Sequence, residues 1–187
     1  MIKKCLFAAA SLAAFAAATP AAAQPRVEVH GGWDRIQSGG VHEDGVLYGV
    51  GVGYDVPIGR NAFIGADLSA DLSTGEQCET GVIVANDRTC IEAGRDLAAG
   101  VRVGVNVTPR TAIYALGGYT NARFRLDYTN PANVTTSVSE NLDGFRLGAG
   151  IQQRFGRNAY AKVEYRYSNY ESDTTRHNVI VGLGLTF

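Results

Sequence analysis

Ionisable side chains recur at every second position in several stretches of this sequence. Lys162, Glu164 and Arg166 form one such run, and Arg123 and Arg125 begin another. Because alternate residues of an extended chain point to the same side, each run would place its charges on one face. Carboxylates and cations gathered on one face can neutralise one another as ion pairs. This face contains seven acids and seven bases: Glu28, Asp34, Asp55, Asp67, Asp71, Asp127, Glu164, Arg102, Arg123, Arg125, Arg146, Arg154, Lys162 and Arg166.

The elements that must position these charges are β-strands. Beyond residue 24 the sequence has no helical period, and it alternates with period two between clusters of Gly, Pro, Asn and Asp. The pattern predicts eight strands, over 26–37, 45–58, 61–74, 94–108, 111–128, 140–156, 159–172 and 176–187. Tight connections alternate with longer polar loops, which we expect at 38–44, 75–93, 129–139 and 173–175. In an antiparallel up-and-down meander, all tight turns then lie at one end and all loops at the other.

The second face of these strands is bulky and apolar. Val46, Tyr48 and Val50 are typical of it, and in the strand over 111–128 we assign to it Tyr114, Leu116, Phe124 and Leu126. A soluble eight-stranded barrel would turn its charges outward and fill its interior with apolar side chains. The apolar face is continuous here, whereas many glycines lie between the charges, as expected for a barrel in lipid. The sequence therefore predicts an all-β transmembrane barrel over 24–187, its lumen plugged by ion pairs because an unmatched buried charge is costly.

The first 23 residues predict an export signal. Lys3 and Lys4 precede a short alanine-rich apolar stretch that ends in a run of small residues. A positive n-region, an apolar h-region and a small-x-small site are the parts of a cleaved signal peptide. We expect cleavage after Ala23, with Ala21 and Ala23 at the site and Gln24 as the new N-terminus.

Cys78 and Cys90 are the two cysteines that remain beyond the predicted signal. An even pair in an exported chain favours a disulfide, here one that closes a single loop. A metal site would need more ligands, and neither histidine nor a further cysteine lies nearby in the sequence. We expect no metal and no cofactor, and the formal net charge of −1 offers no basic patch for nucleic acid.

The mature chain resembles the opacity-type family of small outer-membrane β-barrels, relatives of the OmpA membrane domain and of OmpX. The features that carry this resemblance are the export signal, the eight-strand pattern, the stretch VEYRYSNYES at 163–172 and the ending RHNVIVGLGLTF. It implies location in the outer membrane of a Gram-negative cell, with tight turns in the periplasm and loops outside. It also implies that the final alternating residues are an address read by the barrel-assembly machinery: Val179, Val181, Leu183, Leu185 and Phe187.

Three classes of function remain to be compared. Some outer-membrane barrels modify lipid A, but this chain has three histidines, and Arg166 occupies the position of the histidine in the His-x-Ser-Asn motif of the deacylases. His177 and Ser168 lie on neighbouring predicted strands, so an approach of the two remains open, although we expect no enzyme. A small porin or conduit is the second alternative, which a charged lumen disfavours. The expectation is a monomeric structural or surface-interaction protein that contacts lipid, lipopolysaccharide, host molecules or phage through its loops.

Overall fold

A computed structural model describes residues 24–38, 41–81, 87–132, 134–171 and 174–187. The predicted cleavage site at Ala21 and Ala23 lies outside these residues, and Gln24 is the first residue of β1. The described residues contain no helix that is long and apolar enough to cross a membrane.

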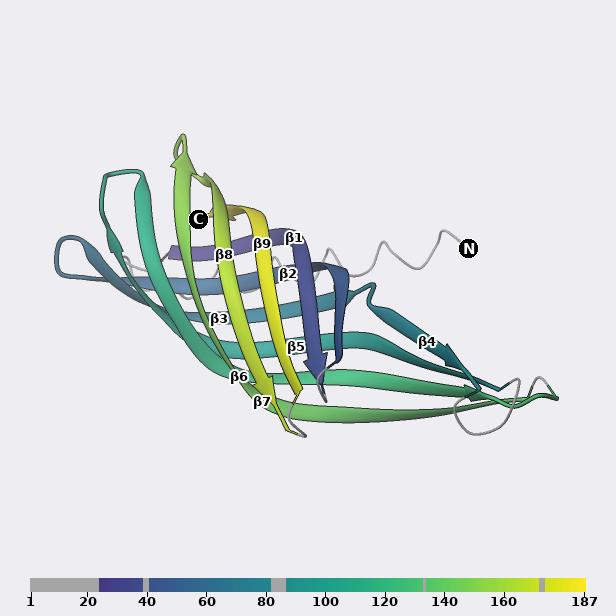
Figure 1. Cartoon of the computed structure of the whole chain (residues 1–187). Coiled ribbons are helices and arrows are strands. Elements are labelled where there is room, and N and C mark those ends of the chain that lie inside the picture. The colour runs from purple at the N-terminus through teal and green to yellow at the C-terminus, as the bar shows by residue number, and fades with distance from the viewer. Residues whose placement is uncertain (1–23, 39–40, 82–86, 133, 172–173) are drawn as a thin grey trace.

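In the part of the chain that the structure describes, nine antiparallel strands form one sheet, and eight of them close into a ring (Figure 1). The ring is an up-and-down meander that β1–β9 and β3–β5 pairing closes, while β4 pairs with β5 at one end only. The strands are β1 (Gln24–Ser38), β2 (Val41–Ile58), β3 (Ala62–Ser73), β4 (Glu76–Thr80), β5 (Arg88–Asn106), β6 (Thr111–Thr129), β7 (Thr135–Phe155), β8 (Ala159–Tyr170) and β9 (Thr174–Thr186). The eight-stranded fold expected from period two is therefore present.

Tight turns gather at one end of the barrel, which we call the turn end. Gly59 and Gly156 adopt φ values of 63° and 66°, a left-handed conformation that glycine enters at no steric cost. The third turn is held by the Val107 N–H, which donates to the Thr111 carbonyl at 2.9 Å. The opposite end, where β2, β5 and β7 begin, is called the loop end.

The barrel exposes apolar side chains and buries charged ones. Val29 and Leu183 are each 61% exposed, whereas Arg102 and Asp34 are 1% exposed. Glycines make room for the long inward side chains: a Cβ on Gly51 would lie 2.9 Å from Glu28 Cγ. An exposed apolar wall around a charged interior is the arrangement that lipid as a solvent selects.

Strand β6 has the opposite orientation to the one we assigned from the sequence. Tyr114 is buried and Leu116 is half-buried inside the barrel, whereas Arg123 and Arg125 are exposed on the outer side. The Tyr114 hydroxyl has a polar partner inside the lumen, so its ring did not mark a lipid-facing position. The two arginines lie beyond the level at which β8 and β9 end, where a charge no longer has to face inward.

At the loop end, β5, β6 and β7 continue past the ends of β8 and β9, as Figure 1 shows. Pairing between β6 and β7 extends to Thr129↔Thr135, although β8 leaves β7 at Gly144. Together with β4 these extensions form a sheet that we call the protruding sheet: residues 76–80, 88–95, 123–129 and 135–142. Much of the expected loops 75–93 and 129–139 is therefore strand.

Candidate functional site

The turn end of the lumen holds the first group of ion pairs. Arg26 of β1 pairs with Asp67 and, at 3.3 Å, with Asp55. Arg102 of β5 donates from Nε to the Asp55 carboxylate at 2.8 Å, and its guanidinium lies 4.9 Å from the centre of the Tyr114 ring. Two cations and two carboxylates thus neutralise one another, and the aromatic ring covers one guanidinium.

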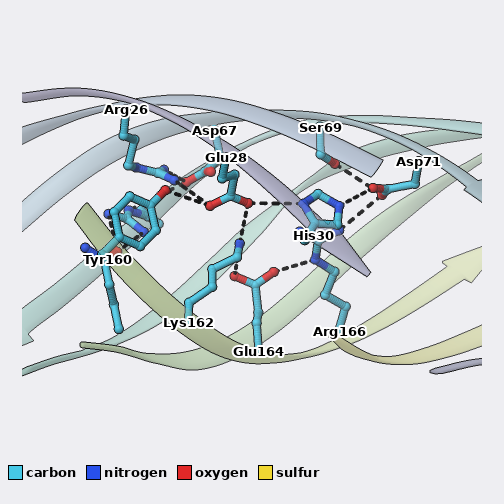
Figure 2. Close-up of polar contacts among 12 residues, drawn as sticks. Arg26, Glu28, His30, Asp67, Ser69, Asp71, Tyr160, Lys162, Glu164 and Arg166 are labelled. Carbon is cyan, nitrogen blue, oxygen red and sulfur yellow. Dashed lines mark hydrogen bonds and ion pairs between the residues drawn. The ribbon is translucent and has the colours of Figure 1, made fainter. Parts of the chain in front are cut away.

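A second group, in the middle of the lumen, begins at Glu28 (Figure 2). Its carboxylate lies 2.6 Å from Lys162 Nζ and accepts a hydrogen bond of 2.8 Å from the Tyr160 hydroxyl. His30 lies between two carboxylates, with Nδ1 3.3 Å from Glu28 and Nε2 2.5 Å from Asp71. These contacts connect β1 with β3 and β8 across the lumen.

Glu164 continues this middle group on β8. Its carboxylate pairs with Arg166, lies 3.0 Å from Lys162 Nζ and accepts a hydrogen bond of 2.5 Å from the Tyr114 hydroxyl. Arg166 in turn lies 3.1 Å from Asp71. Each carboxylate therefore has at least two polar partners, which is the condition under which a buried charge is tolerated.

The third group lies towards the loop end and is centred on Asp96. Its carboxylate pairs with Arg146 and, at 3.0 Å, with Arg176. It also accepts hydrogen bonds from the Tyr170 hydroxyl at 2.7 Å and the Thr120 hydroxyl at 2.6 Å. Asp96 on β5 is thereby connected to β6, β7, β8 and β9.

Arg176 extends the third group to Asp34 of β1. It donates from Nε to Asp34 at 2.7 Å, and the same carboxylate accepts from Asn178 at 2.7 Å and from the Ser73 hydroxyl at 2.6 Å. We call the three groups together the lumen network.

Charge in the lumen network is nearly balanced. Moving a carboxylate or an ammonium out of water costs several kcal/mol, which only close partners offset. Spaces of about 30 Å³, beside Glu28 and Arg146, and of about 90 Å³, beside Asp55 and Arg154, lie in the lumen and have room for a few waters. Seven carboxylates face six lysine or arginine cations, with His30 as a further basic group: Glu28, Asp34, Asp55, Asp67, Asp71, Asp96, Glu164, Arg26, Arg102, Arg146, Lys162, Arg166 and Arg176.

Of the fourteen residues expected in the lumen, ten belong to the network. Arg154 is half-buried at the turn end, where its Nη2 lies 3.5 Å from Gln24 Oε1. Asp127 is half-buried on the protruding sheet, on the same strand as the exposed Arg123 and Arg125. The ten that meet in the network are Glu28, Asp34, Asp55, Asp67, Asp71, Arg102, Arg146, Lys162, Glu164 and Arg166.

Sequence reasoning missed Arg26, Asp96 and Arg176. Arg26 lies two residues from Glu28, and Asp96 lies six residues from Arg102. Arg176 lies three residues from the outward Val179, which places it on the lumen face. Strict alternation to the strand ends would therefore have found all three. The hydroxyls of Tyr114, Tyr160 and Tyr170 were missed for a different reason. A tyrosine ring suits lipid, interface and lumen alike, and only its partner decides among them.

Ser168 and His177 lie on opposite sides of the barrel wall. Ser168 is buried and accepts a hydrogen bond of 2.9 Å from Arg146 Nε. His177 pairs with Tyr167 in the ladder and points outward, where its Nδ1 lies 2.7 Å from the Tyr165 hydroxyl. A nucleophile and its base must lie within hydrogen-bond reach, so this pair does not form a catalytic dyad.

Two further contacts order the loop end. Cys78 of β4 and Cys90 of β5 stand opposite each other in the ladder and form a disulfide. Arg35 donates to Asp44 from Nε at 2.8 Å and from Nη2 at 2.9 Å, and this bidentate pair lowers the pKa of the exposed Asp44 carboxyl.

Comparison with known families matches residues 7–187 to a model described as the outer membrane protein beta-barrel domain. An uncharacterized protein of Coxiella burnetii (strain RSA 493 / Nine Mile phase I) is 29% identical over 149 residues. That match covers 70% of this chain and 56% of the relative, so the chain spans little more than half the relative's length.

Solved structures share the fold. Ail, the attachment invasion locus protein of Yersinia pestis in complex with the heparin analogue sucrose octasulfate, has a TM-score of 0.62 at 13% identity, over 88% of this chain and 99% of Ail. A major outer membrane protein of Thermus thermophilus has a TM-score of 0.61 at 14% identity, over 89% of this chain and all of that one (100%). Neisserial surface protein A has a TM-score of 0.58 at 12% identity, over 87% and 97%. At these identities the likeness is one of fold.

Proposed function

Since the chain belongs to the outer membrane protein β-barrel domain family, we propose that it is a structural and surface-interaction protein with a closed lumen. Its contacts with other molecules are made at the loop end, in the class of roles that includes adhesion, surface antigens and envelope integrity. The name of Ail describes attachment. For this chain we propose a role of the same class because the protruding sheet extends past the barrel at the loop end, where other molecules can reach it.

The observation that carries this proposal is the lumen network. All eight strands of the ring contribute polar side chains to it, and the cations and carboxylates hold one another in place from the turn end to the loop end. A solute would have to displace paired charges to pass, so the wall serves as an anchor and the exposed loop end is left as the site of recognition.

The orientation follows the usual asymmetry of such barrels, with short turns in the periplasm and the protruding sheet outside the cell. We also propose cleavage after Ala23 and an assembly signal on β9. The outward residues of β9 and the Phe187 that follows it are all exposed, from Val179 at 42% to Phe187 at 65%. Deletion of Phe187 should leave unfolded protein in the periplasm, as measured by fractionation and immunoblotting, and insertion at the wild-type level would contradict the signal.

Two measurements test the proposed function together. Outer-membrane fractions of expressing cells are run on SDS gels with and without boiling, and a folded barrel should change its mobility when boiled. Purified protein is then added to planar lipid bilayers, where the closed lumen predicts no stable channel. A soluble periplasmic protein without a mobility shift would contradict the barrel role, and a reproducible nanosiemens-scale opening would favour a small porin.

A further inference from the structure

The outer wall of the barrel is hollowed near the turn end. A groove of about 840 Å³ lies over β3, β5, β6, β7 and β8, and the outward side chains that line it are apolar apart from the Tyr165 hydroxyl. This volume is in the range of small-molecule sites in proteins. Because the groove opens outward, it faces lipid and is separate from the charged lumen.

Two alanines form the floor of this groove. Ala115 of β6 stands opposite Ala149 of β7 in the ladder, and larger residues flank the pair in the same row, Val103 on β5 and Tyr165 on β8. An alanine side chain ends at Cβ, so the wall is lower at the pair than on either side of it. The next row towards the turn end consists of branched side chains that also line the groove: Val105, Ile113, Ile151 and Val163.

The groove lies in the half of the membrane nearest the turn end. Ala115 is five residues from Arg110 in the turn between β5 and β6, which is about 17 Å at about 3.4 Å per strand residue. With a strand tilt of about 40°, the alanine lies about 13 Å below the turn, and half of the hydrocarbon core is about 15 Å thick. An acyl chain of the leaflet on this side therefore reaches the floor of the groove.

Each tight turn next to the groove contains an exposed arginine: Arg60, Arg110 and Arg157. These turns join β2 to β3, β5 to β6 and β7 to β8, and residues from both strands of every turn line the groove. The stretches 58–62, 106–112 and 155–159 contain no acidic residue, and none of the three arginines forms an ion pair with a described residue. The rim beside the groove is therefore positively charged.

The three turns lie along one rim of the barrel (Figure 1). The Asn106 N–H donates to the Asn61 carbonyl at 2.7 Å, which connects the turn between β2 and β3 to the end of β5. The Arg154 N–H donates to the Arg110 carbonyl at 2.8 Å, which connects the turn between β5 and β6 to the end of β7. These hydrogen bonds hold neighbouring arginine-bearing turns in fixed order along the groove.

We propose that the groove and the turn arginines bind one anionic glycerophospholipid of the leaflet at the turn end. An acyl chain lies over the pair Ala115 and Ala149, while Arg110 and Arg157 hold the phosphate and the anionic headgroup by charge-assisted hydrogen bonds. The sequence of parts matches such a lipid, with charge at the membrane surface and an apolar chain below it. The inference goes beyond the proposed function and rests on it only for the position of the barrel in the membrane.

A second copy of the chain fits this groove less well than a lipid does. Copies in one membrane share one orientation, so their turns lie at the same depth. Contact through the groove would bring two sets of turn arginines to the same level, where like charges repel. A phospholipid brings the opposite charge to that level.

The charged part of the site is tested with protein in lipid vesicles and two spin-labelled lipids, phosphatidylglycerol and phosphatidylcholine, with the nitroxide on the acyl chain. Electron paramagnetic resonance separates lipid held at the protein from free lipid, and wild type should prefer phosphatidylglycerol. Arg110→Gln with Arg157→Gln should lower this preference at least about fivefold, roughly the contribution of one basic residue near an anionic surface. The matched control, Arg123→Gln with Arg125→Gln, removes two exposed arginines at the loop end and should keep the preference.

The groove is tested with Ala115→Phe and Ala149→Phe together, which fill it and leave the turn arginines in place. This variant should lower the preference for phosphatidylglycerol several-fold, because the acyl chain can no longer lie against the wall. Its matched control, Ala66→Phe with Ala70→Phe, enlarges two exposed alanines of β3 outside the groove and should behave as wild type.

Three results would overturn the inference. Equal association of both lipids with wild type would mean that the groove holds no particular lipid. A phenylalanine variant that matches wild type would mean that the arginines attract lipid without the groove. A wild-type dimer that the phenylalanine variant abolishes would identify a second copy as the occupant.

Each variant is first checked for the boiling-dependent gel shift. Loss of that shift in wild type would contradict the proposed function itself. A normal shift with equal association of the two lipids contradicts only the lipid site.

Discussion

Asp96 is a residue on which the rest of the barrel depends. It lies on β5 and receives polar contacts from four other strands, through Thr120, Arg146, Tyr170 and Arg176. Removing it would leave two buried guanidinium groups short of a partner, and an uncompensated buried charge costs far more than an ion pair contributes.

The variant Asp96→Ala should therefore lower the free energy of unfolding by about 3–5 kcal/mol. Urea titration of lipid-embedded protein, followed by the gel shift, measures this change. Asp44→Ala is the matched control, because it removes an exposed carboxylate from an ion pair with Arg35. Equal stability of the two variants would show that the lumen network is not the stabilising element.

At the level of single residues, alternation located most lumen charges but not their partners. Glu28, Glu164 and Arg166 could be identified because charge in a period-two strand has one plausible side. The hydrogen bond from the Tyr114 hydroxyl to Glu164 could not be identified, because it joins β6 to β8 inside the lumen. No local sequence pattern indicates which residues of two such strands will meet. Which carboxylate meets which cation depends on strand tilt and register, which one sequence does not give.

Among the strands, β6 shows where the face assignment failed. Near the turn end, β6 has Tyr114 inside the lumen, and near the loop end it has Arg123 and Arg125 on the outer side. The apolar ring and the two charges therefore both favoured the opposite face assignment. The assignment assumed one environment along the whole strand. In fact β6 passes from lipid into the protruding sheet, and the rule that charge faces inward applies only within lipid.

This change of environment predicts different effects for matched substitutions on two strands. Val181 on β9 and Val138 on β7 are 56% and 60% exposed, but we place the first in lipid and the second in water. Val181→Arg should destabilise the folded barrel by about 2–4 kcal/mol, as arginine does on the lipid face near the midplane. Val138→Arg should leave stability almost unchanged.

Urea titration in lipid vesicles compares the two valine variants with wild type. An equal loss of stability for both would mean that the protruding sheet is embedded in the bilayer. No loss for either would place Val181 outside lipid and contradict the orientation of β9.

For the whole molecule, the ring and the protruding sheet are separable in the pairing scheme. The ring is closed by β1–β9 and β3–β5 pairs, and among the described residues the outer parts of β6 and β7 make no ladder with β1, β3 or β9. Turn chemistry and period two were enough to predict that ring. The length of the protrusion was not predictable, because polar, serine- and threonine-rich strands in water look like loops in a sequence.

Replacing residues 125–139 with an Asn-Gly turn should therefore leave the barrel folded. Phe124 and Glu140 are directly opposite in the ladder, so a two-residue turn can join them without changing the register. The shortened protein should keep its boiling-dependent gel shift. A shortened protein that no longer folds would mean that the protrusion is needed to close the ring.

The pairing of β1 with β9 also determines when folding can finish. Val27 stands opposite Leu185, so the first strand of the ring waits for the last one to be synthesised before its edge is covered. Contacts so distant in sequence form slowly, since a long loop must close first. After synthesis the chain therefore passes through a period in which the edge of β1 that β9 will cover is still open, and an open strand edge of this kind favours aggregation.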